Sequence, residues 1–418
     1  MSSLYCGIDF GTSNSTVGVS DMAQARLLPL EGERVTLPSA LFFSFENDGV
    51  RFGRGAIDSY VEGEEGRLMR SLKSILGSSL MHEKTRIRAR FMTFADILGH
   101  FIGHLREKLE VQTGAAAERA VFGRPVRFVD EDDEADAAAQ AMLEQIARAQ
   151  GFSEIAFQFE PIAAALDYEQ GIDREELVLI VDIGGGTSDF SIVRVSPERA
   201  RKADRHDDIL AYGGVHIGGT DFDRLLSIAE VMPHLGLGSF TADGKRQLPK
   251  RNFNDLATWH RINSLYTREV MNELRQIRYE AAQRDLVDRL IQIIEERRGH
   301  SLALAVEQAK IDLRDADAAL IRLARFIDSG DVSVTRSGFE AVVDEPMQRL
   351  THAIENLLAA AGVGGGEIDT VFLTGGSSSI PYLQRTVAAS LPNARMVAGD
   401  LLGSVGTGLA LDARRKFA

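Results

Sequence analysis

The stretch Leu179–Ser188, LIVDIGGGTS, decides the fold that the sequence predicts. It joins an apolar β-strand that ends in Asp182 to a turn of three glycines, Thr and Ser, and a second β-rich run follows. The segment Cys6–Ser13, CGIDFGTS, repeats this pattern with Asp9 at the end of its strand. Because the two copies lie far apart in the chain, the repeat predicts two related lobes rather than a solenoid.

A third glycine turn, Thr374–Pro381, follows another apolar strand. Such turns expose backbone N–H groups that suit phosphate oxygens, and Ser/Thr hydroxyls add donors. An aspartate at the strand end supplies the charged oxygen that Mg²⁺, or its water shell, needs beside a nucleotide. Single Gly/Ser turns are common and structurally ordinary. Three such turns in one chain, two of them preceded by an aspartate at the strand end, favour a nucleotide-binding site.

Two other nucleotide-binding motifs do not fit the sequence. A Walker A loop requires Lys followed by Ser or Thr, whereas Gly244-Lys245 is followed by Arg246. No G-x-G-x-x-G segment opens a helix after a strand with an acidic residue downstream, so a Rossmann domain is disfavoured.

Composition narrows the function classes further. The chain has 418 residues, a formal charge of −14 and a single cysteine, Cys6. The acidic charge disfavours nucleic-acid and anionic-membrane binding, because phosphate surfaces select an excess of Lys and Arg. One cysteine excludes an internal disulfide and a Cys-based metal cluster, and we expect Cys6 to be a buried small hydrophobe. No run approaches 18 apolar residues, so we expect neither an export signal nor a membrane-spanning helix. We therefore expect the protein to be cytoplasmic.

Short β-branched runs alternate with helical stretches, which predicts an α/β protein. The expected strands are 4–10, 16–20, 41–45, 119–122, 155–159, 177–181, 189–195 and 370–373. The expected helices are 94–111, 131–149, 162–169, 284–298, 302–325, 337–361 and 382–391. We expect lobe I to span 1–172, with 395–418 returning to it, and lobe II to span 173–394. Within lobe II, about 222–337 reads as a mostly helical insertion with Trp259 as an anchor of its core.

Six segments resemble, in order, those of the actin-like ATPase superfamily, and specifically the nucleotide-binding domain of the heat shock protein 70 (DnaK-like) chaperones. They are two phosphate loops, Gly7–Ser15 and Val181–Asp189; a connecting segment, Phe159–Tyr168; a turn, Ile217–Asp223; an E-x-A-K segment, Glu307–Lys310; and an adenosine loop, Thr374–Pro381. The resemblance implies a duplicated, ribonuclease H-like fold. Two lobes would flank a cleft that holds ATP or ADP with Mg²⁺.

The resemblance also implies roles for single residues. Asp9, Glu160 and Asp182 would position the water shell of Mg²⁺, and Thr187 would lie near the γ-phosphate and the attacking water. The phosphates would be held by Gly11, Thr12, Ser13, Asn14, Gly184, Gly185 and Gly186, with Gly218 and Gly219 as further nucleotide-binding residues. The nucleoside would be lined by Glu307, Lys310, Arg314, Gly375, Gly376, Ser377 and the region of Asp400.

The sequence departs from the family pattern at several positions. Ile57 occupies the place that we assign to a catalytic lysine, and removing such a charge beside the γ-phosphate commonly costs about 10²–10³ in rate. Arg54, Arg70 and Lys73 are the nearby residues that could replace it. Ile311 and Ser379 stand where the family has two adenine-stacking arginines, and an arginine that the family places downstream of Arg124-Pro125-Val126 is missing.

The last cleft motif lies close to Ala418, so we expect no peptide-binding domain, as in the short YegD-type branch of the family. The predicted function is that of a monomeric, chaperone-like Mg-ATP-binding protein. Slow hydrolysis or nucleotide-controlled lobe closure would regulate a protein partner of unknown identity. The alternatives are a nucleotide-binding switch or scaffold without useful turnover, and a kinase or filament protein of the same superfamily.

Overall fold

The computed structural model describes residues 5–21, 24–47, 49–116, 118–129, 132–169, 171–202, 204–399 and 403–418. The first large sheet has the strand order β11-β10-β1-β2-β3, and β4 pairs with β2. These strands are β1 Tyr5–Phe10, β2 Asn14–Ser20, β3 Ala25–Leu27, β4 Thr36–Pro38, β10 Arg119–Arg124 and β11 Glu154–Phe159. The central strand β1 pairs antiparallel with β2 and parallel with β10.

The second large sheet repeats this arrangement in the order β14-β13-β12-β17-β18. Its strands are β12 Glu176–Ile183, β13 Ser188–Val195, β14 Ile209–Val215, β17 Thr370–Thr374 and β18 Arg395–Ala398. The central strand β12 pairs antiparallel with β13 and parallel with β17. The predicted two-lobed α/β fold, with a duplicated sheet, is therefore confirmed.

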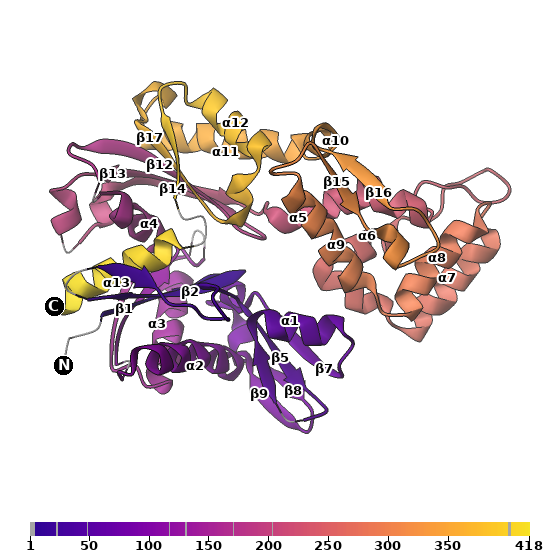
Figure 1. The fold of residues 1–418 in the computed structure, drawn as a ribbon, viewed down its shortest axis with the longest axis horizontal. Helices are drawn as coiled ribbons and strands as arrows, with labels where there is room; N and C mark the ends of the chain where they lie inside the picture. Colours follow the sequence, from indigo (N-terminus) through magenta and orange to yellow (C-terminus); the bar gives the residue numbers. More distant parts are fainter. Residues whose placement is uncertain are drawn as a thin grey trace.

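Each sheet carries a large insertion (Figure 1). Between β3 and β10 lie a small sheet of β5 Ala40–Ser44, β6 Val50–Phe52 and β7 Gly66–Arg70, a hairpin of β8 Lys84–Ile87 and β9 Arg90–Thr93, and the helices α1 Gly53–Val61 and α2 Phe94–Thr113. The helix α3 Asp133–Ala149 then packs beside α2.

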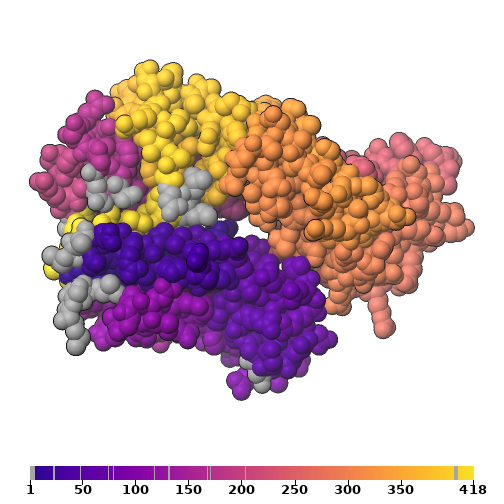
Figure 2. Space-filling view, in the orientation of Figure 1, coloured from indigo at the N-terminus to yellow at the C-terminus, as the bar shows by residue number. Residues whose placement is uncertain are grey.

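The insertion of the second sheet is mostly helical. It contains α5 Gly219–Leu226, α6 Arg251–Ala257, α7 Arg268–Glu280, α8 Arg284–Glu295, α9 Gly299–Asp312 and the hairpin of β15 Ala318–Ile321 and β16 Val332–Thr335. The helices α10 Arg336–Val342, α11 Asp344–Ala361 and α12 Pro381–Ser390 complete this lobe. In the space-filling view, the salmon part of this insertion, which contains α7 and α8, extends to the right beyond the indigo first lobe (Figure 2). None of the helices in the described part of the chain is long and apolar enough to cross a bilayer.

The two lobes meet where α4 Glu160–Glu169 crosses α13 Ser404–Phe417. A Cβ built on Gly408 would collide with the carbonyl group of Ala163, so the two helix backbones are in direct contact. Gly7 on β1 and Gly18 on β2 let α13 approach these strands equally closely. A Cβ on either glycine would collide with the α13 backbone. One hydrophobic cluster runs through this junction and takes buried side chains from both sheets.

Two predicted helices differ from the structure. The helix expected over 302–325 is wrong beyond Asp312, because β15 pairs antiparallel with β16 there and Ile321 is buried in the core of the lobe. This tertiary pairing overrides the helical propensity of the segment. The stretch 337–361 forms two helices, with Val343 between them.

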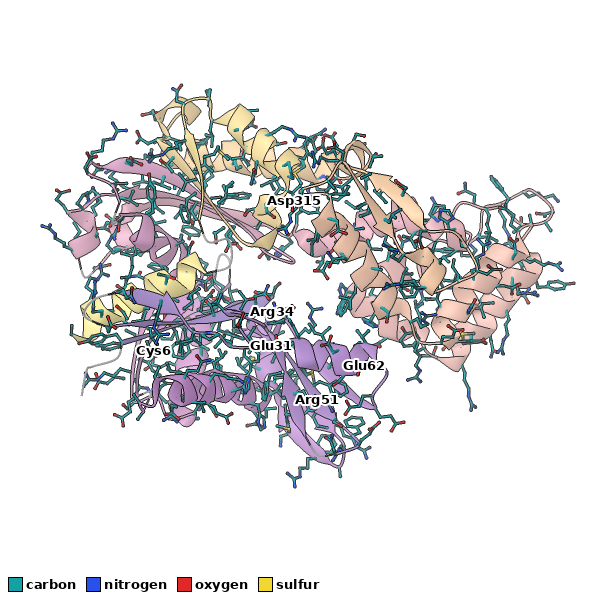
Figure 3. The ribbon with its side chains drawn as sticks, viewed as in Figure 1. Cys6, Glu31, Arg34, Arg51, Glu62 and Asp315 are labelled. Carbon is teal, nitrogen blue, oxygen red and sulfur yellow. The ribbon has the colours of Figure 1, made fainter. Side chains whose placement is uncertain are left out.

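Cys6 is buried inside the first lobe on β1, as expected (Figure 3). Burial raises the pKa of its thiol, which keeps it protonated. The domain boundaries remain a prediction. Because β18 pairs with β17 in the second sheet, we propose that the segment returning to lobe I begins after β18.

Candidate functional site

Four charged side chains meet between the two sheets. Asp9 lies near the end of β1 and Asp182 near the end of β12, while Glu160 is the first residue of α4. Lys73, on the 3₁₀ turn Leu72–Ile75 that follows β7, forms an ion pair with Glu160. The Lys73 side chain is only 9% exposed and the Glu160 side chain 19% exposed. The cleft therefore holds three carboxylates and one buried ammonium group.

The protonation of this group follows from burial and mutual charge. Burial raises the pKa of Asp9 to about 7, with a further rise from Glu160 that Lys73 opposes. Burial raises the pKa of Asp182 to about 8, and the charges of Asp189, Glu160 and Asp9 add to the rise. Although burial lowers the pKa of Lys73, Glu160 and Asp9 outweigh it and raise the pKa overall. Two carboxylates with raised pKa values indicate a site that a cation would stabilise.

Of the three residues that could replace the missing family lysine, Lys73 is the one that pairs with Glu160 in the cleft. Ile57 lies on α1 and packs with Tyr60 against the small buried cluster of Phe42 and Ala56, where α1 covers β5. Lys73 reaches the cleft instead, from the turn that starts at Ser71. Ser71 has a left-handed backbone (φ 57°), a conformation that residues other than glycine adopt rarely and that concentrates at functional sites.

The first glycine loop is held by Ser39, which follows β4. The Ser39 hydroxyl donates to the Gly11 carbonyl oxygen at 2.6 Å, and its backbone N–H donates to the Ser13 carbonyl oxygen at 2.8 Å. A Cβ on Gly11 would collide with the carbonyl oxygen of Asn14, so this turn requires glycine. Thr12, Ser13 and Asn14 thus follow Asp9 within one tight, fixed turn.

The second loop stacks on two other glycine turns. The Gly219 N–H donates to the Gly184 carbonyl oxygen at 3.0 Å, and the Thr220 N–H donates to that of Gly185 at 2.7 Å. A Cβ on Gly218 would overlap the backbone of Gly185 and Gly186, and a Cβ on Gly375 (φ 80°) would strike Asp182.

The two phosphate-loop candidates face each other. A Cβ on Gly185 would strike the hydroxyl of Ser13, so the loops of the two lobes approach within side-chain contact. The Thr187 hydroxyl donates to Asp189 at 3.0 Å. Gly376 and Ser377 form the next turn, and the Ser377 hydroxyl lies 3.4 Å from the Gly184 carbonyl oxygen. The structure thus brings the predicted phosphate-binding residues of both lobes to one place.

The predicted nucleoside side lies along α9. The Lys310 ammonium group bonds to Asp223 at 2.9 Å and to the Gly219 carbonyl oxygen at 3.1 Å, which ties α9 to the glycine turns. Burial raises the pKa of Asp223 to about 6, and Lys310 opposes that rise. Glu307 lies one turn earlier on the same helix and also raises the pKa of Asp223. Asp400, the last predicted nucleoside residue, lies outside the described residues.

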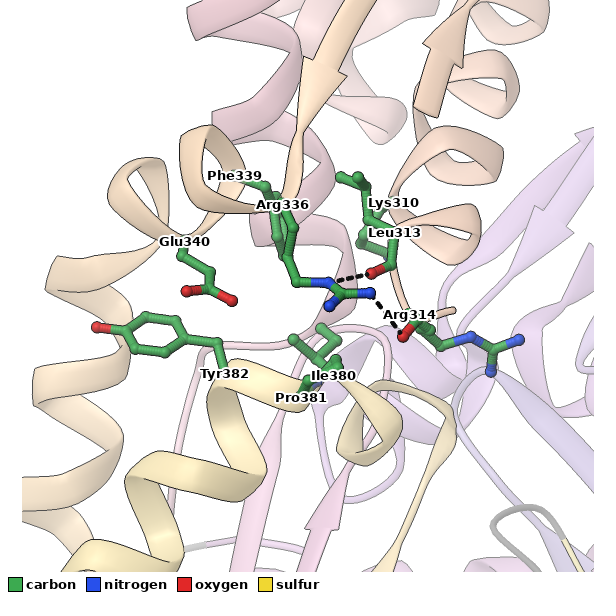
Figure 4. Close-up of a pocket in the computed structure, with 9 residues that line it drawn as sticks. All are labelled: Lys310, Leu313, Arg314, Arg336, Phe339, Glu340, Ile380, Pro381 and Tyr382. Carbon is green, nitrogen blue, oxygen red and sulfur yellow. Dashed lines mark hydrogen bonds between the residues drawn. The ribbon is translucent and has the colours of Figure 1, made fainter. Parts of the chain in front are cut away.

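Arg314 contacts the turn where the sequence lacks the expected arginine. Its guanidinium group donates to the Ser379 hydroxyl at 3.2 Å and to the Ile311 carbonyl oxygen at 3.2 Å. Behind it lies a small pocket, in which Arg336 donates to the carbonyl oxygens of Leu313 and Arg314 (Figure 4). Arg314 therefore bridges α9 and the adenosine-loop candidate, as a residue covering a base there would.

Aromatic side chains join the insertions of the two lobes. The Tyr60 hydroxyl on α1 donates to Asn263 of the second insertion, and the Tyr60 ring meets the edge of His300 at 4.7 Å between centroids. The Arg70 guanidinium group lies 4.7 Å from the centroid of the Trp259 ring, which also packs on His300. Burial lowers the pKa of His300 to about 4, so this ring is neutral at pH 7. The expectation that Trp259 anchors the core of the insertion is corrected: it lies half-buried at the contact with the first lobe.

The residues present fit a nucleotide with a divalent cation. The glycine turns provide a concave backbone surface that side chains would fill, and the carboxylates provide hard oxygen donors. Among the described residues, no three His, Cys, Asp or Glu side chains converge closely enough to bind one ion directly. The roles of Asp9, Glu160 and Asp182 toward the water shell of Mg²⁺ remain predictions.

Sequence reasoning missed Ser39. Asp189 and Asp223 ended two of the predicted motifs but received no role of their own, and Lys73 was one of three possible replacements for the missing lysine. Lys73 carried a signal, since it stands among Leu72, Ile75 and Leu76, and a charged residue in an apolar run needs a buried partner. Ser39 carried none, because its contacts with the first loop depend on the pairing of β4 with β2.

Comparisons with known proteins agree with this geometry. Residues 5–231 and 282–398 match the family model described as Hsp70 protein. Chaperone protein DnaK from Mycoplasmoides gallisepticum is 26% identical over 406 residues, which cover 93% of this chain and 56% of the relative. DnaK of Mycoplasmopsis agalactiae is 26% identical over 397 residues (92% and 54%), and that of Thermotoga maritima over 394 residues (91% and 54%).

The chain thus spans about half the length of these curated relatives. The segment 232–281, which includes α6 and α7, lies outside the family match. Since the match covers most of the chain and includes both glycine loops of the cleft, the chain belongs to the Hsp70 family.

Proposed function

We propose that this chain binds ATP with Mg²⁺ between its two lobes and hydrolyses it slowly. The observation that carries the proposal is the position of Lys73, a buried ammonium group paired with Glu160 and flanked by Asp9 and Asp182. This cluster lies at the ends of the same strands that lead into the two glycine loops. Family membership supports nucleotide binding by a chaperone-like protein.

Each group of residues has a distinct task in this proposal. The glycine loops around Ser13 and Gly185 would bind phosphate oxygens through backbone N–H groups and hydroxyls. Asp9, Glu160 and Asp182 would hold Mg²⁺ through its waters, and the metal supplies charge neutralisation beside the phosphates. Lys73 would stabilise negative charge that develops on the γ-phosphate, while Glu160 fixes its direction. Thr187 would orient the attacking water.

The proposal includes control of a protein partner by lobe movement. Both lobes contribute to the cleft, and they share the close backbone contact between α4 and α13. A nucleotide that touches both glycine loops would favour one angle between the lobes over another. The identity of the partner and the relation to the YegD-type branch belong to the proposal as well.

A single-turnover experiment tests this function. Excess full-length protein is mixed with Mg²⁺ and γ-labelled ATP, and protein-bound label and free phosphate are measured together. Lys73→Ala should retain bound label but lower the rate of phosphate release by about 10²–10³, because the transition-state charge loses its nearest cation.

Ile57→Val is the matched control, since it trims a side chain of the same lobe that packs against the buried cluster of Ala40, Phe42 and Ala56. Its rate should equal that of the unmodified chain. Bound but unhydrolysed ATP in the unmodified chain would make the protein a switch or scaffold. Phosphate transfer only with an added acceptor would make it a kinase. If no label binds, the nucleotide proposal is wrong.

A further inference from the structure

The hairpin of β8 and β9 has two chemically different faces. In its antiparallel register, Thr85 and Ile87 are buried while Lys84 and Arg86 are exposed. Phe91 stands directly opposite Arg86 and is 67% exposed, the value of a side chain almost fully in solvent. The outer face of the hairpin therefore presents an aromatic ring between basic groups.

Positive charge is concentrated on this hairpin. The run Lys84–Arg90, KTRIRAR, contains four basic residues and no acidic residue, in a chain whose net charge is −14. Arg67 of the neighbouring strand β7 adds an exposed guanidinium group and donates to the Arg86 carbonyl oxygen at 3.3 Å. We call Arg67, Lys84, Arg86 and Phe91 the basic hairpin patch. Arg90 pairs with the buried Ile87 and lies on the other face of the hairpin.

The turn of the hairpin holds an arginine in an uncommon backbone conformation. Arg88 has a left-handed backbone (φ 55°) at a turn position where Gly, Asn or Asp is strongly preferred. Its guanidinium group lies 6.0 Å from the centroid of the Phe45 ring, itself 40% exposed. A residue in such a costly conformation persists where surrounding interactions hold it, and such residues gather at functional surfaces.

The patch is separate from the nucleotide cleft. Figure 1 places β8 and β9 at the free end of the first lobe, away from α13 and from the second sheet. Neither strand contributes a residue to the glycine loops or to the charged cluster around Lys73. Exposed aromatic and arginine side chains together are the composition of binding hot spots.

We propose that the basic hairpin patch is a docking surface for an acidic protein segment that carries an apolar side chain. The guanidinium groups match carboxylates in fork geometry, and the Phe91 ring supplies an apolar anchor. A long polyanion such as a nucleic acid fits less well. Glu83 directly precedes Lys84 and Glu65 lies two residues before Arg67, and these exposed carboxylates would repel negative charge that extends beyond the patch.

The test uses the full chain and a fluorescein-labelled peptide of about twelve Asp, Glu and Leu residues, with binding followed by fluorescence anisotropy. A single-stranded oligonucleotide of similar length serves as the competing class. We expect the peptide to bind at low ionic strength and to weaken as salt screens the charges. The double variant Arg86→Glu/Phe91→Ala should bind it about tenfold or more weakly, the loss typical of one hot-spot residue.

Lys250→Glu/Val111→Ala is the matched control, because it makes the same charge change and also removes one exposed apolar side chain elsewhere on the surface. This control should bind the peptide as the unmodified chain does, and thermal unfolding should show that both double variants remain folded. Equal loss in both variants, or no peptide binding at low salt, would overturn the proposal. Tighter binding of the oligonucleotide that the Arg86/Phe91 variant abolishes would assign the patch to nucleic acid and overturn it too.

Discussion

The two large sheets are built alike, yet their insertions bring different chemistry to the cleft. In each sheet a central strand ends in an aspartate, turns through glycine and hydroxyl residues, and pairs antiparallel with the next strand. The insertion of the first sheet delivers Lys73, while that of the second delivers Glu307 and Lys310. The duplicated frame therefore sets where carboxylates and glycine loops lie. The inserted segments set which cations reach them.

A second difference lies within the repeated strand pair. Asp9 stands opposite Thr16, whereas Asp182 stands opposite Asp189. The Thr16 hydroxyl lowers the pKa of Asp9, while the charge of Asp189 raises that of Asp182. Burial is the main cause of both raised pKa values, and the residues opposite shift them in opposite directions. Equivalent positions in the fold are thus electrostatically unequal.

The strongest test breaks the junction that holds the two lobes together. Gly408→Val places a branched side chain against the carbonyl group of Ala163, a backbone atom that cannot change rotamer. Overpacking typically costs about 1–3 kcal/mol, and we expect at least the upper end of that range. The free energy of unfolding, measured by urea denaturation, reports the loss.

The control for that variant is Gly55→Ala on α1, where an added Cβ meets no atom within 4 Å. Because alanine favours helix over glycine, this variant should be as stable as the unmodified chain or slightly more stable. Equal stability of the Gly408 and Gly55 variants would show that the lobes do not depend on the close crossing of α4 and α13.

A smaller effect should follow from making the second strand pair like the first. Asp189→Thr removes a charge that raises the pKa of Asp182, so that pKa should fall from about 8 toward the value of Asp9, about 7. A carboxyl group with a raised pKa binds more protons in the folded state, so its contribution to stability declines as pH rises from about 4 to its folded pKa. The upper end of this decline should move down by about one pH unit.

The measurement is the free energy of unfolding between pH 4 and 9 without nucleotide. Asp207→Asn is the control, because the Asp207 side chain is fully exposed in the same lobe. An unchanged pH profile in Asp189→Thr would mean that the two aspartates do not owe their inequality to the residue opposite.

The smallest expected effect concerns the contact between the two insertions. Tyr60→Phe keeps the ring against His300 but removes the hydroxyl that bonds to Asn263. One such hydrogen bond contributes about 0.5–1.5 kcal/mol, so release of bound nucleotide should become about two- to tenfold faster. Stopped-flow displacement of a fluorescent ATP analogue measures the rate.

The control is Tyr279→Phe, because Tyr279 is an exposed tyrosine on α7 and its hydroxyl should not affect nucleotide release. Equal release rates in the two variants would show that the Tyr60 contact does not control nucleotide release.

The sequence predicted the parts of the fold that follow from local pattern. The strands leading into Asp9 and Asp182 and the glycine turns after them carry short-range signals, and each lies where it was expected. The segment 318–321 was misread because alanine, leucine and isoleucine also suit a helix. Only its distant partner β16 decides the outcome.

The carboxylates and loops of the site were predictable, whereas the sequence left its cation open among Arg54, Arg70 and Lys73. Asp9 and Asp182 are fixed by the strands on which they stand. Lys73 depends on the left-handed turn at Ser71 and on a partner, Glu160, that lies far away in the chain. The hydrogen bond between Arg314 and Ser379 was equally unpredictable, because the two residues lie far apart in the sequence.

Trp259 gives the molecule an optical property. It is the single tryptophan of the chain, and it touches the first lobe through Arg70 while belonging to the insertion of the second. A cation held against an indole ring shifts its emission, and separating the lobes would replace that cation with water. The wavelength and intensity of the tryptophan emission of the unlabelled protein should therefore change as the cleft opens. Emission recorded at one wavelength would then follow the movement of the lobes in real time.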